Sequence, residues 1–118
     1  MLDLIDLHTH SRASDGSDTP ARIVRYACEK GLKGIALTDH DTVSGLPEFL
    51  EETKKCGIVG VPGVEISTRL FSKELHIVGL FINPETPELS ELLERMRSGR
   101  EKRNREIIHK LNVLGYEI

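Results

Sequence analysis

The segment LDLIDLHTHS, residues 2–11, ends an apolar run with two histidines two positions apart. We expect a first strand from Leu2 to His8. Because side chains at positions i and i+2 of a strand point to the same face, His8 and His10 would present two nitrogen ligands together. The segment therefore predicts both the first strand of the fold and the beginning of a metal site.

Short apolar segments and helical patterns alternate along the rest of the chain. Thr19 followed by Pro20 is typical of a helix start, and Gly31 of a helix stop. Strands alternating with helices indicate parallel βαβ units and an α/β fold. We expect further strands over 33–38, 58–67 and 75–82, and further helices over 46–55 and 88–114, the last with a break allowed at 98–99.

The composition excludes several classes of protein. The chain has 118 residues, 38% of them hydrophobic, and a net charge of -3, which argues against a general polyanion-binding surface. Aromatic residues make up 4%, too few for a single-strand nucleic-acid stacking platform. No apolar run reaches the roughly 20 residues of a membrane helix, and we expect no secretory signal because a basic n-region and a cleavage site are not seen. Cys28 and Cys56 are too far apart for a CxxC site, so we expect reduced thiols in a cytoplasmic protein.

Candidate metal ligands accompany every predicted strand. In parallel α/β folds, ligands bind where strands end and loops begin. Four of the five histidines belong to this set, and imidazole with carboxylate but without cysteine indicates a multi-metal hydrolytic centre. The set comprises His8 and His10, Asp15 in the next loop, Asp39-His40-Asp41 after the second strand, Glu65 late in the third and His76 near the start of the fourth.

Each of these residues also has an ordinary structural interpretation. Asp15 precedes Gly16 as a turn residue would, and Asp39 and Asp41 fit as turn or cap residues. His76 taken alone would be a polar strand residue. Glu65 lies in an apolar strand, where a carboxylate needs a partner. The metal-centre interpretation is favoured because all of these residues fall at the same end of successive strands.

Four motifs together resemble a known family. DLHTHS at 6–11, TDHDT at 38–42, GVE at 63–65 and LHIVG at 75–79 resemble the first three motif blocks of the PHP superfamily, named for polymerase and histidinol phosphatase. Their order and spacing are most similar to the stand-alone PHP phosphoesterases. These include nucleoside 3′,5′-bisphosphate phosphatases that also trim short RNA oligonucleotides from the 5′ end.

The resemblance implies a fold and a reaction. The fold would be the N-terminal part of a distorted seven-stranded β/α, TIM-like barrel that binds two or three Mn, Zn or Fe ions at the strand C-terminal ends. The reaction would be in-line attack on phosphorus by a metal-bound hydroxide, acting on a phosphomonoester of a nucleotide or a short oligonucleotide. We divide the chain into 1–83, the metal-binding βα units, and 84–118, a basic helical segment.

The resemblance also implies a role for each candidate residue. Asp39 would support catalysis by contacting the metal ligands rather than the metal, and Asp41 would either do the same or cap the loop. The metal ligands would be His8 and His10 for the first ion, Asp15 and His40 for the second, Glu65 bridging the first and third, and His76 for the third.

The chain departs from the family because it supplies about three of the barrel's repeats. The later histidine and Asp-x-His pair of the family lie beyond its 118 residues. We expect weaker binding of a third metal. An uncovered sheet edge would favour a homo-oligomer or a rearranged C-terminal region. The alternative to an enzyme is a metal-binding or structural PHP fragment without turnover.

A basic segment over 95–105 has two interpretations. Interleaved glutamates favour an exposed, salt-bridged helix. Apolar stripes over 89–96 and 107–114 would join through Arg100 and Arg103 in a continuous helix, so these two interrupt an otherwise buried face. Arginine there would suit binding of a substrate phosphate. His109 in the same helix is expected to pack beside its apolar neighbours.

Overall fold

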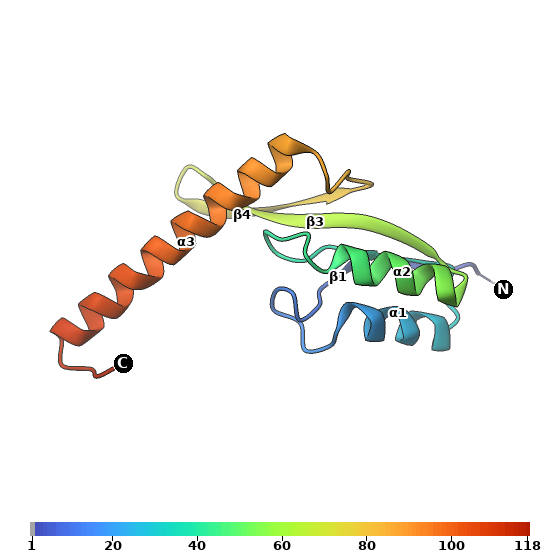
Figure 1. Ribbon diagram of the computed structural model, residues 1–118, viewed down its shortest axis with the longest axis horizontal. Helices are drawn as coiled ribbons and strands as arrows, with labels where there is room; N and C mark the ends of the chain where they lie inside the picture. Colours follow the sequence, from blue (N-terminus) through green and yellow to red (C-terminus); the bar gives the residue numbers. More distant parts are fainter. Residues whose placement is uncertain (1) are drawn as a thin grey trace. The chain divides into compact units, whose positions relative to one another are not determined.

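The computed structural model describes residues 2–118 and divides into two compact units, residues 2–84 and 85–118 (Figure 1). The second unit contains one long helix. In chain order, the first unit comprises β1 (Ile5–Thr9), α1 (Pro20–Glu29), β2 (Gly34–Leu37), α2 (Leu46–Cys56), β3 (Val59–Leu70) and β4 (Lys73–Leu80), and the second comprises α3 (Pro87–Val113).

The four strands form one sheet in the order β1-β2-β3-β4. β1 pairs with β2, and β2 with β3, in parallel, with α1 and α2 as the connections. The chain is therefore α/β, as predicted. The sheet of the described residues has four strands, so the seven-stranded barrel stays a prediction.

β4 departs from the expected parallel pattern because it pairs with β3 in the antiparallel sense. Leu70 lies opposite Lys73, so only Phe71 and Ser72 connect the two strands. A connection this short allows a hairpin, whereas a parallel crossover needs a dozen or more residues. The turn places Phe71 at a φ of 57°, a left-handed conformation that is uncommon for a bulky residue.

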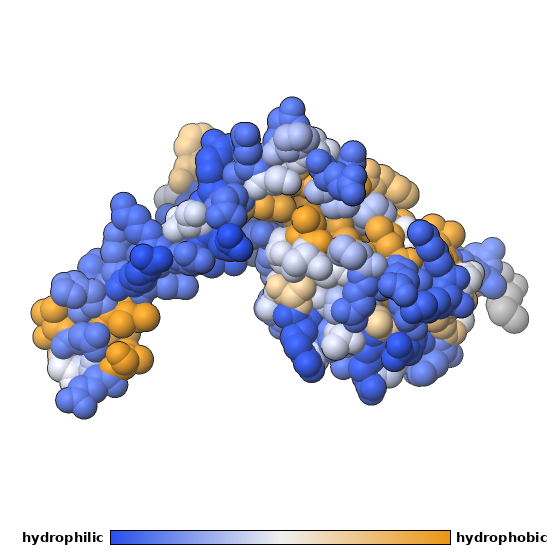
Figure 2. Space-filling model, in the orientation of Figure 1, coloured by the Kyte–Doolittle hydropathy of each residue, from blue (hydrophilic) through white to orange (hydrophobic). Residues whose placement is uncertain are grey.

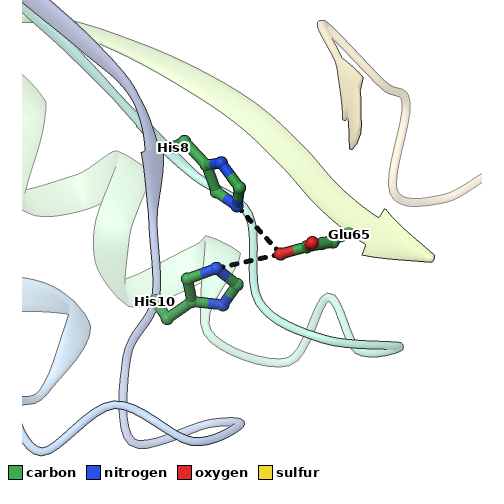
Figure 3. Close-up of side chains that lie close together, drawn as sticks. All are labelled: His8, His10 and Glu65. Carbon is green, nitrogen blue, oxygen red and sulfur yellow. Dashed lines mark hydrogen bonds and ion pairs between the residues drawn. The ribbon is translucent and has the colours of Figure 1, made fainter. Parts of the chain in front are cut away.

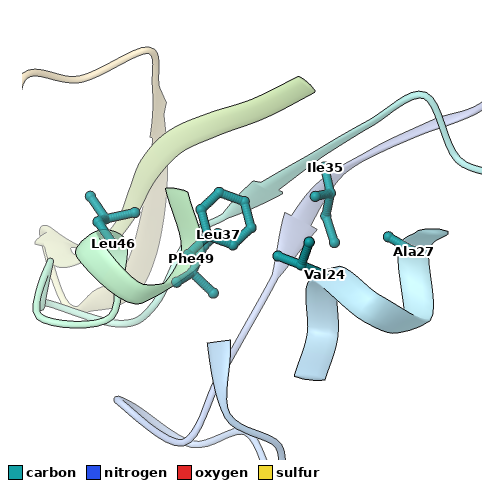
Figure 4. Close-up of a cluster of buried hydrophobic side chains, with 6 residues drawn as sticks. All are labelled: Val24, Ala27, Ile35, Leu37, Leu46 and Phe49. Carbon is teal, nitrogen blue, oxygen red and sulfur yellow. The ribbon is translucent and has the colours of Figure 1, made fainter. Parts of the chain in front are cut away.

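The hydrophobic core lies between the two short helices and the parallel strands (Figure 4). Full burial of one large apolar side chain stabilises a fold by about 1.5–3 kcal/mol. The packing of this cluster therefore holds in place the strand ends that carry the candidate ligands. The buried cluster consists of Val24, Ala27, Ile35, Leu37, Leu46 and Phe49.

The helix ends set the positions of the strands. The Thr19 side chain accepts a hydrogen bond from the Arg22 amide at 3.3 Å, so the predicted start of α1 is confirmed. Gly31 and Gly57 follow α1 and α2 with φ of 76° and 71°, conformations that glycine adopts without strain. β1 starts three residues later than predicted, at Ile5 rather than Leu2.

α3 is continuous and shows no break at 98–99. Glu94 pairs with Arg97 at 2.8 Å, and Glu101 pairs with Arg105 at 3.5 Å, as expected for an exposed, ion-paired helix. Ile107 and Ile108 are 47% and 44% exposed, so the apolar face predicted for this half of the helix is not buried. Figure 2 shows hydrophilic residues along most of α3 and apolar ones toward its C-terminal end. Among residues 2–118, no helix is long and apolar enough to cross a membrane.

Candidate metal centre

Four imidazoles converge on one carboxylate at the edge where the parallel pairing ends. The carboxylate belongs to Glu65, which is 6% exposed. Figure 3 shows His8 and His10, from the end of β1, pointing toward Glu65 on β3. His40 follows β2, and His76 lies in β4.

Backbone pairing explains why Glu65 lies beside His40. The parallel register of β2 with β3 ends at Leu37 opposite Pro62, and His40 then forms an isolated bridge with Glu65. The Glu65 amide donates to the Asp39 carbonyl oxygen at 3.0 Å, and the Asp41 amide donates to the Glu65 carbonyl oxygen at 2.9 Å. The loop after β2 therefore runs along β3 and delivers His40 to the carboxylate.

Both oxygens of Glu65 contact imidazole nitrogens. Oε2 lies 2.9 Å from Nε2 of His8 and 3.0 Å from Nε2 of His10. Oε1 lies 3.2 Å from Nδ1 of His76, while Nε2 of His40 is 3.8 Å from Oε2. A carboxylate that uses both oxygens in this way is placed to bridge two cations.

The imidazole rings form a row. Ring centroids are 5.1 Å apart for His8 and His10, 4.5 Å for His10 and His40, and 5.2 Å for His40 and His76. Imidazoles held this close together can offer a metal ion several nitrogen ligands at once.

A buried nitrogen without a hydrogen-bond partner indicates whether His10, Asp15 and His40 fit a cation. Nδ1 of His10 is buried and has no hydrogen-bond partner. Asp15 lies close by, with Oδ1 3.6 Å from this nitrogen and Oδ2 3.5 Å from Nε2 of His40. Buried polar atoms normally have a partner, and a cation held among the three side chains would supply one. The residues therefore fit a divalent ion.

Three sets of ligand atoms are close enough to hold an ion, with all atoms of a set within 4.8 Å of one another. Imidazole and carboxylate ligands together suit manganese, zinc and iron. His10, His40 and Glu65 each occur in two sets, so the sets form one connected centre. Among residues 2–118 the sets are His8, His10 and Glu65; His10, Asp15 and His40; and His40, Glu65 and His76.

The charges of the centre shift two pKa values. Burial raises the pKa of Glu65, but the hydrogen bond with His8 and the charges of His40, His8 and His10 outweigh it, so this pKa lies below its ordinary value. The pKa of His76 is raised, first by its hydrogen bond with Glu74 and then, against burial, by Glu65. Glu65 is therefore held as a carboxylate, ready to act as a ligand.

All six predicted ligands come together, although not all in the expected way. Glu65 is in the middle of β3 rather than at its end, because β3 continues past β2 to pair with β4. His76 lies opposite Ser67 in an antiparallel strand, in the middle of β4 rather than near its start, and the hairpin brings it to the site. Metal binding by these residues stays a prediction.

The two aspartates beside His40 contact the backbone of neighbouring segments. Asp41 has a φ of 53°, and its side chain accepts a hydrogen bond from the Ser67 amide at 2.8 Å, as a loop cap does. Asp39 accepts a hydrogen bond from the Ser11 amide at 2.6 Å. Arg100 and Arg103 are exposed residues of α3, and their role in phosphate binding stays a prediction.

Sequence reasoning missed Glu74. Its Oε1 lies 3.1 Å from Nε2 of His76, so both nitrogens of that imidazole face a carboxylate. Glu74 precedes His76 by two positions in β4 and shares its face. This is the spacing that identified His8 and His10, so the signal was present in the sequence.

Comparison with known proteins agrees with the resemblance. Residues 6–114 match the family model described as the PHP domain. A 5′-3′ exoribonuclease of Haemophilus influenzae is 43% identical over 110 residues, which cover 93% of this chain and 40% of the relative. A 3′,5′-nucleoside bisphosphate phosphatase of Chromobacterium violaceum is 40% identical over 111 residues, which cover 94% of this chain and 39% of the relative.

A solved structure extends the similarity to the fold. It belongs to a candidate metal-dependent phosphoesterase of Bifidobacterium adolescentis and aligns with a TM-score of 0.85 at 30% identity, covering 92% of this chain and 38% of that one. The chain thus spans about two fifths of the length of the relatives it matches.

Proposed function

Because the chain belongs to the PHP domain family, we propose that it forms part of a metal-dependent hydrolase acting on phosphomonoesters of nucleotides or short oligonucleotides. The observation that carries the proposal is the convergence of four imidazoles on the buried Glu65 carboxylate. The imidazole nitrogens that face this carboxylate come from the end of β1, the loop after β2 and β4, so segments far apart in the chain supply one cluster.

The side chains of the centre have separate tasks in this proposal. Two or three divalent ions, Mn, Zn or Fe, would act there as Lewis acids that activate water and neutralise phosphoryl charge. Glu65 is the shared ligand, with His8 and His10 on one side and His76 on the other. Asp15 and His40 complete the centre. Glu65 is buried and Asp15 is exposed, so the Asp15 side of the centre is open to solvent.

The substrate class is inferred from the relatives and from α3. Proteins named as an exoribonuclease and a nucleoside bisphosphate phosphatase act on RNA and nucleotides, so we infer a nucleotide or a short RNA for this chain. We further infer that Arg100 and Arg103 bind a substrate phosphate. In an active protein that contains this chain, Arg100→Ala and Arg103→Ala should raise the Michaelis constant for a nucleotide, while Lys102→Ala should not. Unchanged constants in both arginine variants would favour a surface role.

An alternative is a PHP fragment that binds metal or has a structural role without turnover. The exoribonuclease and the phosphatase that the chain resembles are longer proteins, and the chain spans about two fifths of their length. The six ligands of the described residues would then hold ions that catalyse nothing.

One experiment separates the enzyme from the alternative. Metal content is measured by elemental analysis, and phosphatase activity is then measured with p-nitrophenyl phosphate and a nucleoside bisphosphate in the presence of manganese. Turnover that His8→Ala and His40→Ala abolish, and that His109→Ala leaves intact, supports the enzyme. Bound metal without turnover supports the metal-binding form of the alternative, and a chain that binds no metal would contradict the enzyme and leave only a structural role.

We also propose that the chain self-associates through the open edge of its sheet. β4 is an edge strand, and its Leu75 and Ile77 are 45% and 53% exposed. An exposed apolar edge strand is a template for pairing with another chain. A concentration series in analytical ultracentrifugation should show dimers or larger species, and a compact monomer at all concentrations would contradict this proposal.

A further inference from the structure

The carboxylate of Asp39 is the most deeply buried charged group beside the metal centre. Asp39 is 2% exposed and lies two residues beyond the end of β2 at Leu37. Its Oδ1 accepts hydrogen bonds from the Ser11 amide and the Ser14 hydroxyl, both at 2.6 Å. Its Oδ2 accepts one from the Ser11 hydroxyl, also at 2.6 Å. Both oxygens of this side chain are therefore occupied by donors from a single loop.

The loop that supplies these donors is folded tightly over the end of β1. The Gly16 amide donates to the Ser11 carbonyl oxygen at 2.8 Å, and the Ala13 amide donates to the Ser11 hydroxyl at 3.1 Å. A Cβ atom at Gly16 would collide with the His10 carbonyl oxygen, so the loop approaches the backbone closely there. Charge-assisted hydrogen bonds are about twice as strong as neutral ones, so the Asp39 carboxylate is the main anchor of this loop.

Each residue of this network is adjacent in sequence to a ligand of one set. Ser11 follows His10, Ser14 precedes Asp15, and Asp39 precedes His40. The Asp15 side chain is 68% exposed, so packing contributes little to its position. The hydrogen bond between Ser14 and Asp39 fixes the neighbouring residue instead. The set of His8, His10 and Glu65, by contrast, contains two ligands outside this network, on paired strands.

We propose that Asp39 is a positioning residue that holds His10, Asp15 and His40 together as one cation site through Ser11 and Ser14. The inference rests on the proposed function, because it assumes that the centre binds divalent ions. It assigns Asp39 to one ion specifically. Loss of the Asp39 carboxylate should lower the affinity for that ion and leave the affinity for the ion at His8, His10 and Glu65 unchanged.

The test measures Mn²⁺ binding to the whole chain. Isothermal titration calorimetry gives the affinities, and electron paramagnetic resonance gives the concentration of free Mn²⁺. Asp39→Asn keeps the shape of the side chain but replaces one acceptor oxygen with a donor. Supporting partners of metal ligands typically change affinity 10- to 100-fold, so one class of Mn²⁺ sites should weaken by about that factor. The other class should stay within about twofold of the parent chain.

Three further variants make the result specific. Asp15→Ala removes a ligand of the same set and should weaken the same class. The double variant Asp15→Ala/Asp39→Asn should lose less affinity than the sum of the two single losses, because both residues act on the same cation site. Ser14→Ala removes the hydrogen bond to Asp39 at 2.6 Å and the longer one to Oδ1 of Asp15 at 3.4 Å. It should produce a smaller loss than Asp39→Asn, and it decides the question if Asp39→Asn does not fold. Thr53→Val is the control, since Thr53 is equally buried but bonds to Leu50 within α2.

The outcomes separate this inference from the proposed function. No Mn²⁺ binding by the parent chain overturns both. Parent binding with two unchanged classes in Asp39→Asn or Ser14→Ala overturns the positioning role alone. Equal weakening of both classes, with the same change in Thr53→Val, also overturns it, because general destabilisation would then explain the effect.

Discussion

Residues 2–84 and residues 85–118 use their charged side chains in opposite ways. In the first unit, Asp39 and Glu65 are buried, and their partners come from segments as far as 57 positions away. In α3, charged side chains are exposed and pair three or four positions apart, as Glu94 does with Arg97. Four of the five histidines belong to the first unit.

The difference shows that a sheet brings together residues that are far apart in the sequence, which a single helix cannot do. A helix brings together only neighbours, and exposed ion pairs of this kind contribute about 0.2–1 kcal/mol each. Parallel strands bring distant residues to one edge, where a carboxylate such as Glu65 can be buried because several partners reach it. A site with converging ligands therefore forms in the first unit, and the second offers an extended charged surface.

The largest contrast should come from the core. Phe49→Ala removes a fully buried ring from the layer under the strand ends and should destabilise the chain by about 3–5 kcal/mol. Ile107→Ala truncates a half-exposed side chain of α3 and should change stability by less than about 1 kcal/mol. Thermal unfolding followed by circular dichroism measures both. Similar losses in the two variants would contradict the difference in burial between Phe49 and Ile107.

Removal of single histidines should affect Mn²⁺ affinity differently in the two units. His10 belongs to two of the three ligand sets, so His10→Ala should weaken Mn²⁺ binding at least about 100-fold. His109→Ala, in the exposed half of α3, should leave Mn²⁺ affinity unchanged. Calorimetric titration provides the measurement. A loss of affinity in His109→Ala would show that the second unit contributes a ligand.

Glycine substitutions should act in opposite directions in the two units. Gly16→Ala should destabilise by about 1–3 kcal/mol and weaken Mn²⁺ binding, because the new methyl group displaces the loop from His10. Gly99 lies inside α3 with no atom within reach of a Cβ, so Gly99→Ala should stabilise by about 0.5–1 kcal/mol. Denaturant unfolding gives both values, and a stabilising Gly16→Ala would contradict the close approach of the loop.

The smallest effect should be a pH dependence of the metal-free chain. Because the pKa of His76 is raised in the folded state, the protonated ring favours folding. This contribution is complete below the ordinary histidine pKa of about 6.5 and is lost as pH rises through the raised value. The Tm in excess chelator should therefore fall as pH is raised from about 6 to 8, with a smaller fall in Glu74→Gln.

His109→Gln is the matched control for this series, since it changes a histidine of α3. It should keep the profile of the parent chain. A Glu74→Gln profile identical to that of the parent would remove Glu74 from the explanation, since its hydrogen bond is the largest cause of the shift.

Much of the first unit could be predicted from local sequence signals. Thr19, Pro20 and Gly31 mark the ends of α1 because their side chains or backbone favour those positions. His8 and His10 were predicted as a pair because strand periodicity is a local property. The approach of His8, His10, Asp15 and His40 follows from the rule that parallel strands end at one edge, whereas Glu65 and His76 meet in the antiparallel β3-β4 hairpin.

The rest could not be predicted because it depends on pairing between distant segments. Phe71 and Ser72 are not the residues that two-residue hairpin turns usually contain, so the reversal before β4 left no clear turn signal. The length of β3 beyond Pro62 likewise depends on β4 as a partner. In α3, periodicity predicted an apolar face, but periodicity alone does not say whether that face is covered.

The change of partner along β3 has a consequence for the order of folding. Its second half pairs with β4 across a two-residue turn, and hairpins of this kind form in about 1–10 μs. Glu65 and His76, 11 positions apart, are therefore brought together early. His8 is 57 positions from Glu65 and arrives only when the parallel strands have docked, which is the slower event. Glu65 and His76 are thus brought together by a local hairpin, whereas His8 joins them only when the whole unit has folded.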